Sequence, residues 1–206
     1  MNICLFGGSF DPVHNGHVAM VNYAFQKKQL HKIIIIPAFR SPLKENAYSA
    51  LPFQRFEMVK IAFQDIPNIE VSDFEIKKGG ISYTIETIKH FKNELGNDAN
   101  LYWLLGSDSV PSLPKWKNFS EIIELCRFII IPRKGFPPSL VEDVKGFTPK
   151  QREFIKNSFL DVPTVDISST EIRKFFSQNK EPVNLIPPKV LDYIKAKNLY
   201  FGGKAE

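Results

Sequence analysis

The 206-residue chain has few cysteines and no long apolar run, and we expect it to have no secretory leader. Cys4 and Cys126 lie in or beside apolar segments without partners at metal-ligand spacing, which predicts reduced core thiols and no protein metal site. The longest aliphatic runs, 33–36 and 128–131, are far shorter than the roughly 20 residues that span a bilayer. Residues 1–6 lead directly into glycines with no charged leader, so we expect a cytoplasmic protein that has no membrane partner.

The chain is also short of concentrated charge. Its 27 Lys and Arg against 22 Asp and Glu give a net charge of +5, but these residues are scattered rather than gathered into blocks. The 18 phenylalanines fall mostly at core-like spacings instead of alternating with a basic stripe. This pattern argues against nucleic-acid binding and leaves small anions, such as nucleotides, as candidate ligands.

Short apolar runs alternate with stretches of helical periodicity. Continuous apolar runs predict strands buried on both faces of a parallel sheet, and alternation with helices predicts a doubly wound α/β fold. The expected strands are 3–6, 33–36, 101–105 and 128–131, and the expected helices are 16–28, 53–63, 84–95 and 119–125.

The pattern changes after Pro132. We expect a last strand around 162–167, a helix that begins at Ser168 or Ser169, and another helix after the Pro187–Pro188 pair. The whole is predicted to be a single domain over residues 1–200, with a small C-terminal helical part at about 168–200. Residues 201–206 are expected to form a frayed tail.

A glycine turn stands between the first strand and the first helix. Ligands bind at such strand ends in open α/β sheets, glycines let a phosphate approach the backbone, and the helix start offers unpaired N–H groups. Residues 7–17 read GGSFDPVHNGH, which fits neither G-x-G-x-x-G nor a P-loop. The segment therefore predicts an anion site of another kind.

Two histidines, His14 and His17, follow this turn. Their spacing places both imidazoles on one face at the start of the helix, where they can donate hydrogen bonds to phosphate oxygens. Surface histidines, core histidines and half of a metal site are the alternatives. The adjoining glycine turn favours the phosphate role, and His31 and His90 lie in unrelated segments, which disfavours a metal site.

A second cluster of anion-binding residue types lies near the C-terminus. Ser168 and Glu171 have the spacing of a capping box, which alone predicts only a helix start. Ser169 and Arg173 are four residues apart, so a hydroxyl and a guanidinium can converge on one anion beside that helix start.

Both clusters resemble motifs of the nucleotidylyltransferase superfamily. Residues 7–17 resemble its G-x-F-D-P-x-H-x-G-H signature, and residues 167–173 reproduce its I-S-S-T-x-x-R motif. The resemblance implies a Rossmann-like fold, ATP as donor and Mg²⁺ carried with the ATP. It implies catalytic roles for His14, His17, Lys44 and Arg173. The ATP-binding residues it implies are Gly7, Gly8, Ser9, Phe10, His14, His17, Gly106, Asp108, Ile167, Ser168, Ser169 and Arg173.

Residues for the acceptor must come from the middle of the chain. Tyr83 and Thr84 precede a predicted helix, residues 104–108 end a predicted strand, and Trp116 follows, either to stack on a flat ring or to pack a loop. With 132–135 and a closing helix at 190–200, these features resemble bacterial nicotinate mononucleotide adenylyltransferases. The resemblance implies backbone amides near the nicotinate carboxylate and a tryptophan on the pyridine ring. The acceptor-binding residues it implies are Lys44, Tyr83, Thr84, Asp108, Trp116 and Arg133.

Residues 37–44 resemble the P-P-H-K stretch of the same family, with two departures. Ser41 replaces the first proline and Leu43 replaces the histidine, so the phosphate contact of that histidine is missing. Lys44 is retained and can neutralise phosphate charge alone. The alternative is that Arg40 and Lys44 are two solvated basic residues on a loop.

The expected reaction is adenylyl transfer from ATP to nicotinate mononucleotide, which yields nicotinate adenine dinucleotide and pyrophosphate in NAD biosynthesis. The acceptor phosphate is itself an anion, so no general base is expected. The alternatives are a related enzyme that uses nicotinamide mononucleotide or phosphopantetheine, and a non-catalytic nucleotide sensor. The oligomeric state stays open, including assembly as a homo-oligomer.

Overall fold

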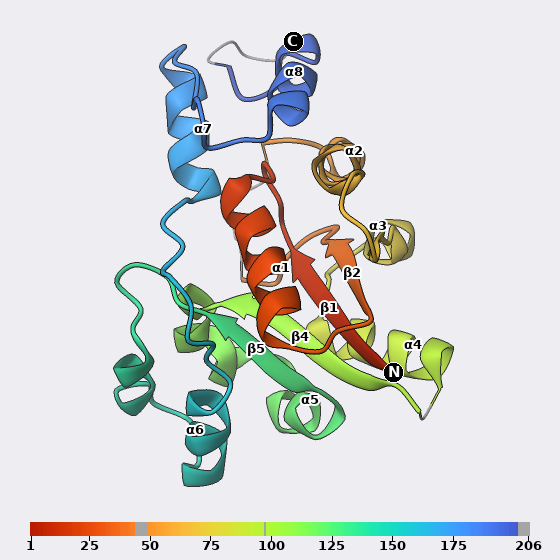
Figure 1. Cartoon of the computed structure of the whole chain (residues 1–206), viewed down its shortest axis with the longest axis vertical. Helices are drawn as coiled ribbons and strands as arrows, with labels where there is room; N and C mark the ends of the chain where they lie inside the picture. The colour runs from red at the N-terminus through yellow and green to blue at the C-terminus, as the bar shows by residue number, and fades with distance from the viewer. Residues whose placement is uncertain (44–48, 97, 202–206) are drawn as a thin grey trace.

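A five-stranded, fully parallel sheet forms the centre of the protein in the computed structural model, which describes residues 1–43, 49–96 and 98–201 (Figure 1). The strand order is β3-β2-β1-β4-β5, and every neighbouring pair runs parallel. The strands are β1 (Asn2–Gly8), β2 (Lys32–Pro37), β3 (Ile69–Val71), β4 (Asn100–Gly106) and β5 (Arg127–Ile131). The predicted doubly wound α/β class is confirmed.

Helices cover both faces of this sheet. The α-helices are α1 (Asn15–Lys27), α2 (Pro52–Phe63), α3 (Phe74–Lys78), α4 (Thr84–Leu95), α5 (Phe119–Leu125), α6 (Pro149–Lys156), α7 (Ser169–Ser177) and α8 (Pro188–Ala196). Two 3₁₀ segments, η1 (Ser107–Lys115) and η2 (Pro138–Glu142), follow β4 and β5. Figure 1 shows α7 and α8 near the end of the sheet toward which β1 points.

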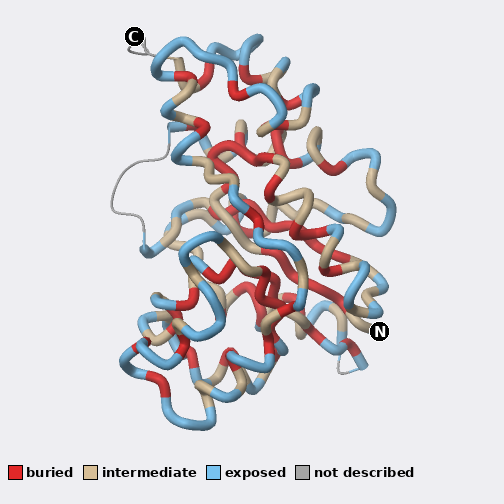
Figure 2. The backbone as a smooth tube through the Cα atoms, turned by 60° about the vertical axis from the view of Figure 1, so that its left-hand side comes forward, coloured by how far each residue is buried: buried red, intermediate tan, exposed pale blue. Residues whose placement is uncertain are grey.

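The sheet separates two hydrophobic cores, because successive side chains of a strand point to opposite faces. Cys4 and Phe6 of β1 pack with α1, α2, α7 and α8, whereas Ile3 and Leu5 pack with α4, α5 and α6. Figure 2 shows the buried strands running through the middle, with exposed residues on the outer parts of the chain. Burial on both faces explains why these strands are continuously apolar.

The strand order also fixes where a ligand can bind. The chain moves from β1 to one side to form β2 and β3, and later returns to place β4 on the other side of β1. The carboxyl ends of β1 and β4, at Gly8 and Gly106, therefore flank the topological switch point. The loops after these two strands diverge there and leave a crevice.

Most predicted elements are confirmed, but two expectations are wrong. In place of a strand at 162–167, only Val165 forms an isolated bridge, to Arg133. Pro163 lacks the N–H that a regular ladder needs there. The predicted helix 190–200 ends at Ala196, because Asn198 and Tyr200 adopt positive φ angles of 50° and 71°, outside helical geometry.

The segment after α8 packs onto the fold. The ring of Phe201, the first residue of the expected tail, meets Phe176 edge-on at 5.2 Å between centroids, and residues 202–206 lie outside the described part. Cys4 and Cys126 are both free and buried, which confirms the expected core thiols, and burial raises both thiol pKa values. No helix of the described part combines the length and apolar character of a membrane span.

Candidate active site

The turn after β1 depends on glycine for close packing. A Cβ on Gly7 would lie 2.6 Å from the indole ring of Trp103, and a Cβ on Gly8 would lie 2.9 Å from the ring of Phe10. Phe10 itself has a φ of 48°, and a cis peptide bond joins Asp11 to Pro12. The backbone thus turns sharply from β1 into α1 and leaves the crevice beside the glycines open.

The two predicted histidines stand together at the start of α1. Their rings stack with centroids 3.7 Å apart, and the backbone N–H of His14 donates to Nδ1 of His17 at 3.2 Å. Because Nδ1 of His17 accepts this hydrogen bond, the neutral ring carries its proton on Nε2. His17 can therefore offer an Nε2–H donor.

His14 is buried and incompletely hydrogen-bonded. Only 2% of it is exposed, and its Nδ1 has no hydrogen-bond partner among the described residues. Burial first, and the nearby charge of Arg133 second, lower the pKa of His14 to about 3, so the ring is neutral near pH 7. An unpaired buried polar atom is rare in proteins and indicates a place for a ligand atom or water.

The start of α7 contacts the same loop. Ser168 caps the helix by accepting a hydrogen bond from the backbone N–H of Glu171. Ser169 Oγ donates to the carbonyl of Pro12 at 2.9 Å, and Arg173 Nη1 donates to the carbonyl of Asp11 at 2.7 Å. The two motifs, more than 150 residues apart in sequence, therefore meet directly.

Gly106, Asp108 and Arg133 lie on the side of the crevice formed by β4 and β5. A Cβ on Gly106 would clash with Oδ1 of Asp108 and would lie 3.1 Å from Cγ of Arg133. Arg133 donates to the carbonyl of Ile167 at 2.6 Å and lines an open hollow of about 630 Å³ together with Lys134. This contact places Arg133 next to the α7 motif.

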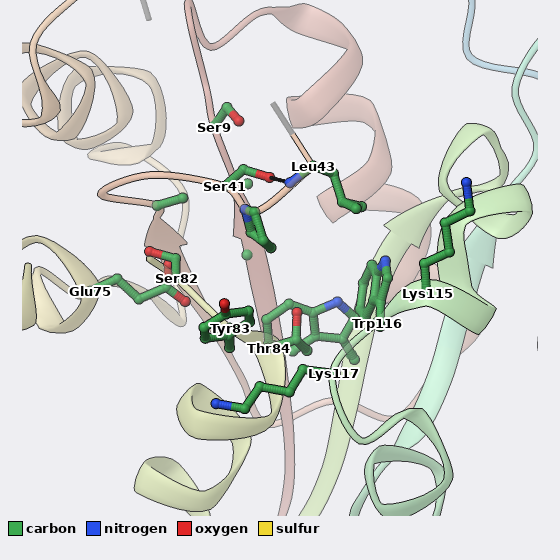
Figure 3. Close-up of a pocket in the computed structure, with 15 residues that line it drawn as sticks. Ser9, Ser41, Leu43, Glu75, Ser82, Tyr83, Thr84, Lys115, Trp116 and Lys117 are labelled. Atoms are coloured by element: carbon green, nitrogen blue, oxygen red, sulfur yellow. Dashed lines mark hydrogen bonds between the residues drawn. The ribbon is translucent and has the colours of Figure 1, made fainter. Parts of the chain in front are cut away.

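A separate cavity of about 400 Å³ opens on the other side of Gly7 and Gly8. Tyr83, Thr84 and Trp116 line it, and Figure 3 shows the three side chains grouped at one end of the cavity. Trp116 meets Trp103 edge-on at 6.4 Å and donates from Nε1 to Ser112 at 3.3 Å. It therefore packs its own loop and also presents a face to the cavity.

Two cationic side chains lie at this cavity. Lys115 and Lys117 both line it, and Nζ of Lys117 lies 4.3 Å from the centre of the Tyr83 ring. Glu86 pairs with both Lys117, at 2.9 Å, and Lys78, at 2.7 Å. Two lysines thus share the half-buried carboxylate of Glu86, and Lys115 adds a further cation at the cavity.

Glu75 is a cavity residue that the sequence did not reveal. It is 4% exposed, and its Oε1 accepts a hydrogen bond from Thr87 Oγ1 at 2.5 Å. Burial raises the pKa of Glu75, although hydrogen bonds from Thr87 and Ser82 oppose the shift. The surrounding sequence, DFEIKK, looks like a solvated charged segment, so no sequence signal marks this residue.

Arg55 is a second residue that sequence reasoning missed. It is fully buried, and its guanidinium donates to the carbonyls of Ser9 at 2.7 Å, Phe39 at 3.0 Å and Ala50 at 3.3 Å. It thereby ties the turn between β1 and α1 to the loop after β2. A signal was present, because Arg55 shares the buried face of α2 with Met58 at helical spacing.

The loop after β2 is only partly described. Lys44 lies outside the described residues, so its predicted role stays a prediction. Ser41 and Leu43, the two departures from the family stretch, both line the cavity, and Ser41 Oγ accepts from the N–H of Leu43 at 3.4 Å (Figure 3). These departures therefore fall at the edge of the cavity.

Comparison with known proteins agrees with this geometry. Residues 5–175 match the cytidylyltransferase-like family. A protein of Clostridium acetobutylicum named "Probable nicotinate-nucleotide adenylyltransferase" is 39% identical, over 95% of this chain and 97% of that protein. The chain belongs to the nicotinate-nucleotide adenylyltransferase family, within the cytidylyltransferase-like proteins. Another member, from Methylacidiphilum infernorum and with the same name, is 38% identical over 96% of this chain and 91% of that protein.

Solved structures support the fold of this family member. The Plasmodium falciparum nicotinic acid mononucleotide adenylyltransferase complexed with NaAD superposes with a TM-score of 0.76. The two chains are 24% identical, with 97% of each covered. A Vibrio parahaemolyticus protein of related description gives a TM-score of 0.67 at 18% identity, with 97% of this chain and 94% of that chain covered. At these identities the likeness establishes the Rossmann-like nucleotidylyltransferase fold.

Proposed function

We propose that this protein transfers the adenylyl group of ATP to nicotinate mononucleotide and forms nicotinate adenine dinucleotide and pyrophosphate in NAD biosynthesis. One observation carries the proposal. The His14–His17 pair and the start of α7 meet at the switch point, directly beside a cavity with aromatic walls. The names of the relatives support the same reaction.

The donor occupies the glycine turn and the two helix starts in this proposal. The phosphates of ATP lie over Gly7–Ser9, where backbone amides and the positive ends of α1 and α7 face them. Arg173 has five N–H donors and uses part of them on Asp11 and Thr170, so others remain for phosphate. The proposed ATP-binding residues are Gly7, Gly8, Ser9, Phe10, His14, His17, Gly106, Asp108, Ile167, Ser168, Ser169 and Arg173.

The chemistry is a problem of position and charge. A phosphate oxygen of the acceptor attacks the α-phosphorus of ATP, a new P–O bond forms, and the bond from the α-phosphorus to the bridging oxygen breaks as pyrophosphate leaves. The attacking group is already an anion, so no general base is required. His14 and His17 donate to phosphoryl oxygens as their charge grows, and each such donor is worth about 10²–10³ in turnover.

The acceptor occupies the cavity of about 400 Å³. Its pyridine ring stacks on Trp116, and its carboxylate faces Thr84 and the positive end of α4. The cations at the edge of the cavity favour an acid over an amide there. Lys44, Tyr83 and Asp108 complete the proposed acceptor set; Arg133 also belonged to the predicted set, but its contact with Ile167 favours the donor side.

We propose Mg²⁺ as the cation carried by the triphosphate. Within residues 1–43, 49–96 and 98–201, no group of three or more His, Cys, Asp or Glu side chains is arranged to hold a metal. Mg²⁺ accepts phosphate and water oxygens as most of its ligands, so this donor set suits a cation held by the nucleotide. Its chemistry is to neutralise phosphate charge.

We propose a cytoplasmic localisation, because the proposed substrates are small and soluble. Assembly as a homo-oligomer stays a prediction, and light scattering during size-exclusion chromatography measures it.

The test is pyrophosphate release from ATP and Mg²⁺ with equal concentrations of nicotinate mononucleotide, nicotinamide mononucleotide or phosphopantetheine. We expect clear preference for the nicotinate acceptor. Preference for another acceptor would reject the assignment of the cavity, and release with none of them would favour a nucleotide sensor.

The histidine variant separates catalysis from binding. His17→Ala should lower kcat by about 10²–10³ while calorimetry still detects ATP binding, because the donor acts mainly on charge that develops during the reaction. His31→Ala is the control, since His31 accepts a hydrogen bond from Asn2 N–H, away from the site. Equal turnover of wild type and His17→Ala would reject the role of His17.

A further inference from the structure

We propose that Tyr200 is a positioning residue for the transfer reaction, which acts through the Asp11 carboxylate to hold the turn between β1 and α1 in its reactive shape. The inference rests on the proposed function and extends it to a residue outside both motifs. Tyr200 is neither one of the proposed ATP-binding residues nor one of the residues that line the acceptor cavity.

The Asp11 carboxylate joins three distant parts of the chain. Asp11 is 3% exposed, and its Oδ1 accepts from the Tyr200 hydroxyl at 2.7 Å and from the N–H of Ala50 at 3.2 Å. Its Oδ2 accepts from the N–H of Ser49 at 3.0 Å. Tyr200 is the one side-chain donor to Asp11 that the described residues provide, beside two backbone amides.

The backbone of Asp11 belongs to the turn that carries His14. The carbonyl of Asp11 accepts a hydrogen bond from Arg173. Phe10, directly before it, has a φ of 48°, which non-glycine residues rarely adopt. A strained turn keeps its shape only when its surroundings fix it from several directions. The hydrogen bond from Tyr200 is one of these constraints. It fixes the side chain of Asp11, and Arg173 holds the carbonyl of the same residue.

Tyr200 is itself held firmly after α8. Its ring stacks on Phe176 of α7 with centroids 6.0 Å apart and planes at 24°, and Phe201 contacts the same ring. Burial first, and the Asp11 carboxylate second, raise the pKa of the Tyr200 hydroxyl, so it stays protonated and donates. The contact with Phe176 links α7, which bears the second motif, to the loop of the first.

The aromatic wall of the acceptor cavity is outside this network. Tyr83, Thr84 and Trp116 come from α4 and the segment after η1, and none of them contacts Tyr200 or Asp11 through a hydrogen bond in the described residues. A loss of the Tyr200 bond should therefore affect the donor phosphates and the rate of transfer. It should leave binding of the acceptor nearly unchanged.

The experiment compares Tyr200→Phe with wild type, with kcat and both KM values measured for pyrophosphate release. Phenylalanine keeps the ring on Phe176 and removes only the hydroxyl. We expect kcat to fall about tenfold, because small misplacements of reacting groups cost up to about 10² in rate, while the KM for nicotinate mononucleotide stays within about twofold. Tyr193→Phe is the matched control, since Tyr193 is a half-buried tyrosine on α8 with no hydroxyl hydrogen bond to the described residues.

A double-mutant cycle tests whether Tyr200 acts through Asp11. Asp11→Asn and Tyr200→Phe should each lower kcat, and the double variant should lower it by less than the product of the two effects. Independent effects would overturn the proposed route. A Tyr200→Phe variant with lower melting temperature but wild-type kcat would show a purely structural role, whereas a wild-type protein that transfers nothing would reject the proposed function itself.

Discussion

Because the imidazole of His14 is buried, we expect this protein to lose stability in mild acid. The pKa of His14 is about 3 in the folded protein, against about 6.5 for an unperturbed histidine. Between these values the unfolded chain binds a proton that the folded protein does not. A histidine whose pKa is lowered by folding therefore destabilises the protein as pH falls from about 6.5 toward about 3.

The size of the effect follows from the shift. The full slope for one proton is about 1.4 kcal/mol per pH unit, and integration from about pH 6.5 to about pH 4.5 gives about 2 kcal/mol of lost stability. His14 is almost fully buried, so solvent screening does not reduce this figure much. The raised pKa of Glu75 acts in the opposite direction, because the folded protein then retains a proton that the unfolded chain releases. The test must therefore isolate His14.

Urea unfolding of wild type and His14→Asn across this pH range isolates the contribution. Asparagine is a favourable N-cap residue, so it suits the position that His14 occupies before α1. We expect the variant to lose about 2 kcal/mol less than wild type between about pH 6.5 and about pH 4.5. His31→Asn, which removes an exposed imidazole away from the site, is the control variant. Parallel profiles for wild type and His14→Asn would refute the reasoning.

Two further substitutions probe the cavity. Gly7→Ala should lower the free energy of unfolding by about 1–3 kcal/mol in urea denaturation, because the added Cβ would lie 2.6 Å from the Trp103 ring; unchanged stability would show that the ring moves freely aside. Trp116→Ala should raise the KM for nicotinate mononucleotide about tenfold in steady-state assays, since an aromatic stack is worth about 1 kcal/mol or more, while Trp116→Phe keeps most of the affinity. Equal effects on the KM for ATP would contradict the assignment of Trp116 to the acceptor.

The parts of the fold that follow from local sequence are those with a continuous apolar run or a strong helical periodicity. The continuous apolar run at 33–36 can be satisfied only by a strand buried on both faces, and α4 shows clear amphipathic spacing. The strand β3 was missed because it has only three residues, none of them buried. The false strand at 162–167 arose because apolar composition alone does not reveal whether a neighbouring strand has free hydrogen-bonding groups.

The residues of the candidate site also differ in how readily the sequence alone reveals them. The glycines and histidines of the first motif are adjacent in sequence, so the sequence alone indicates their chemistry. Glu75 and Arg55 were missed because their surroundings come from other parts of the chain: Arg55 binds carbonyls at Ser9, Phe39 and Ala50. A charged residue on the apolar face of a predicted helix is the signal that would have identified Arg55.

The turn between β1 and α1 owes its shape to charged groups that hydrogen-bond to backbone atoms. Burying a charge costs stability unless hydrogen bonds replace its water. Arg55 donates such bonds to loop carbonyls, and Asp11 accepts them from loop N–H groups. Packing of apolar side chains would fill the same space without fixing the direction of each carbonyl and amide. In a reaction whose nucleophile needs no activation, that direction decides how well phosphate donors converge. The cost of these buried charges is therefore coupled to turnover, and substitutions at them should be judged by kcat as well as by stability.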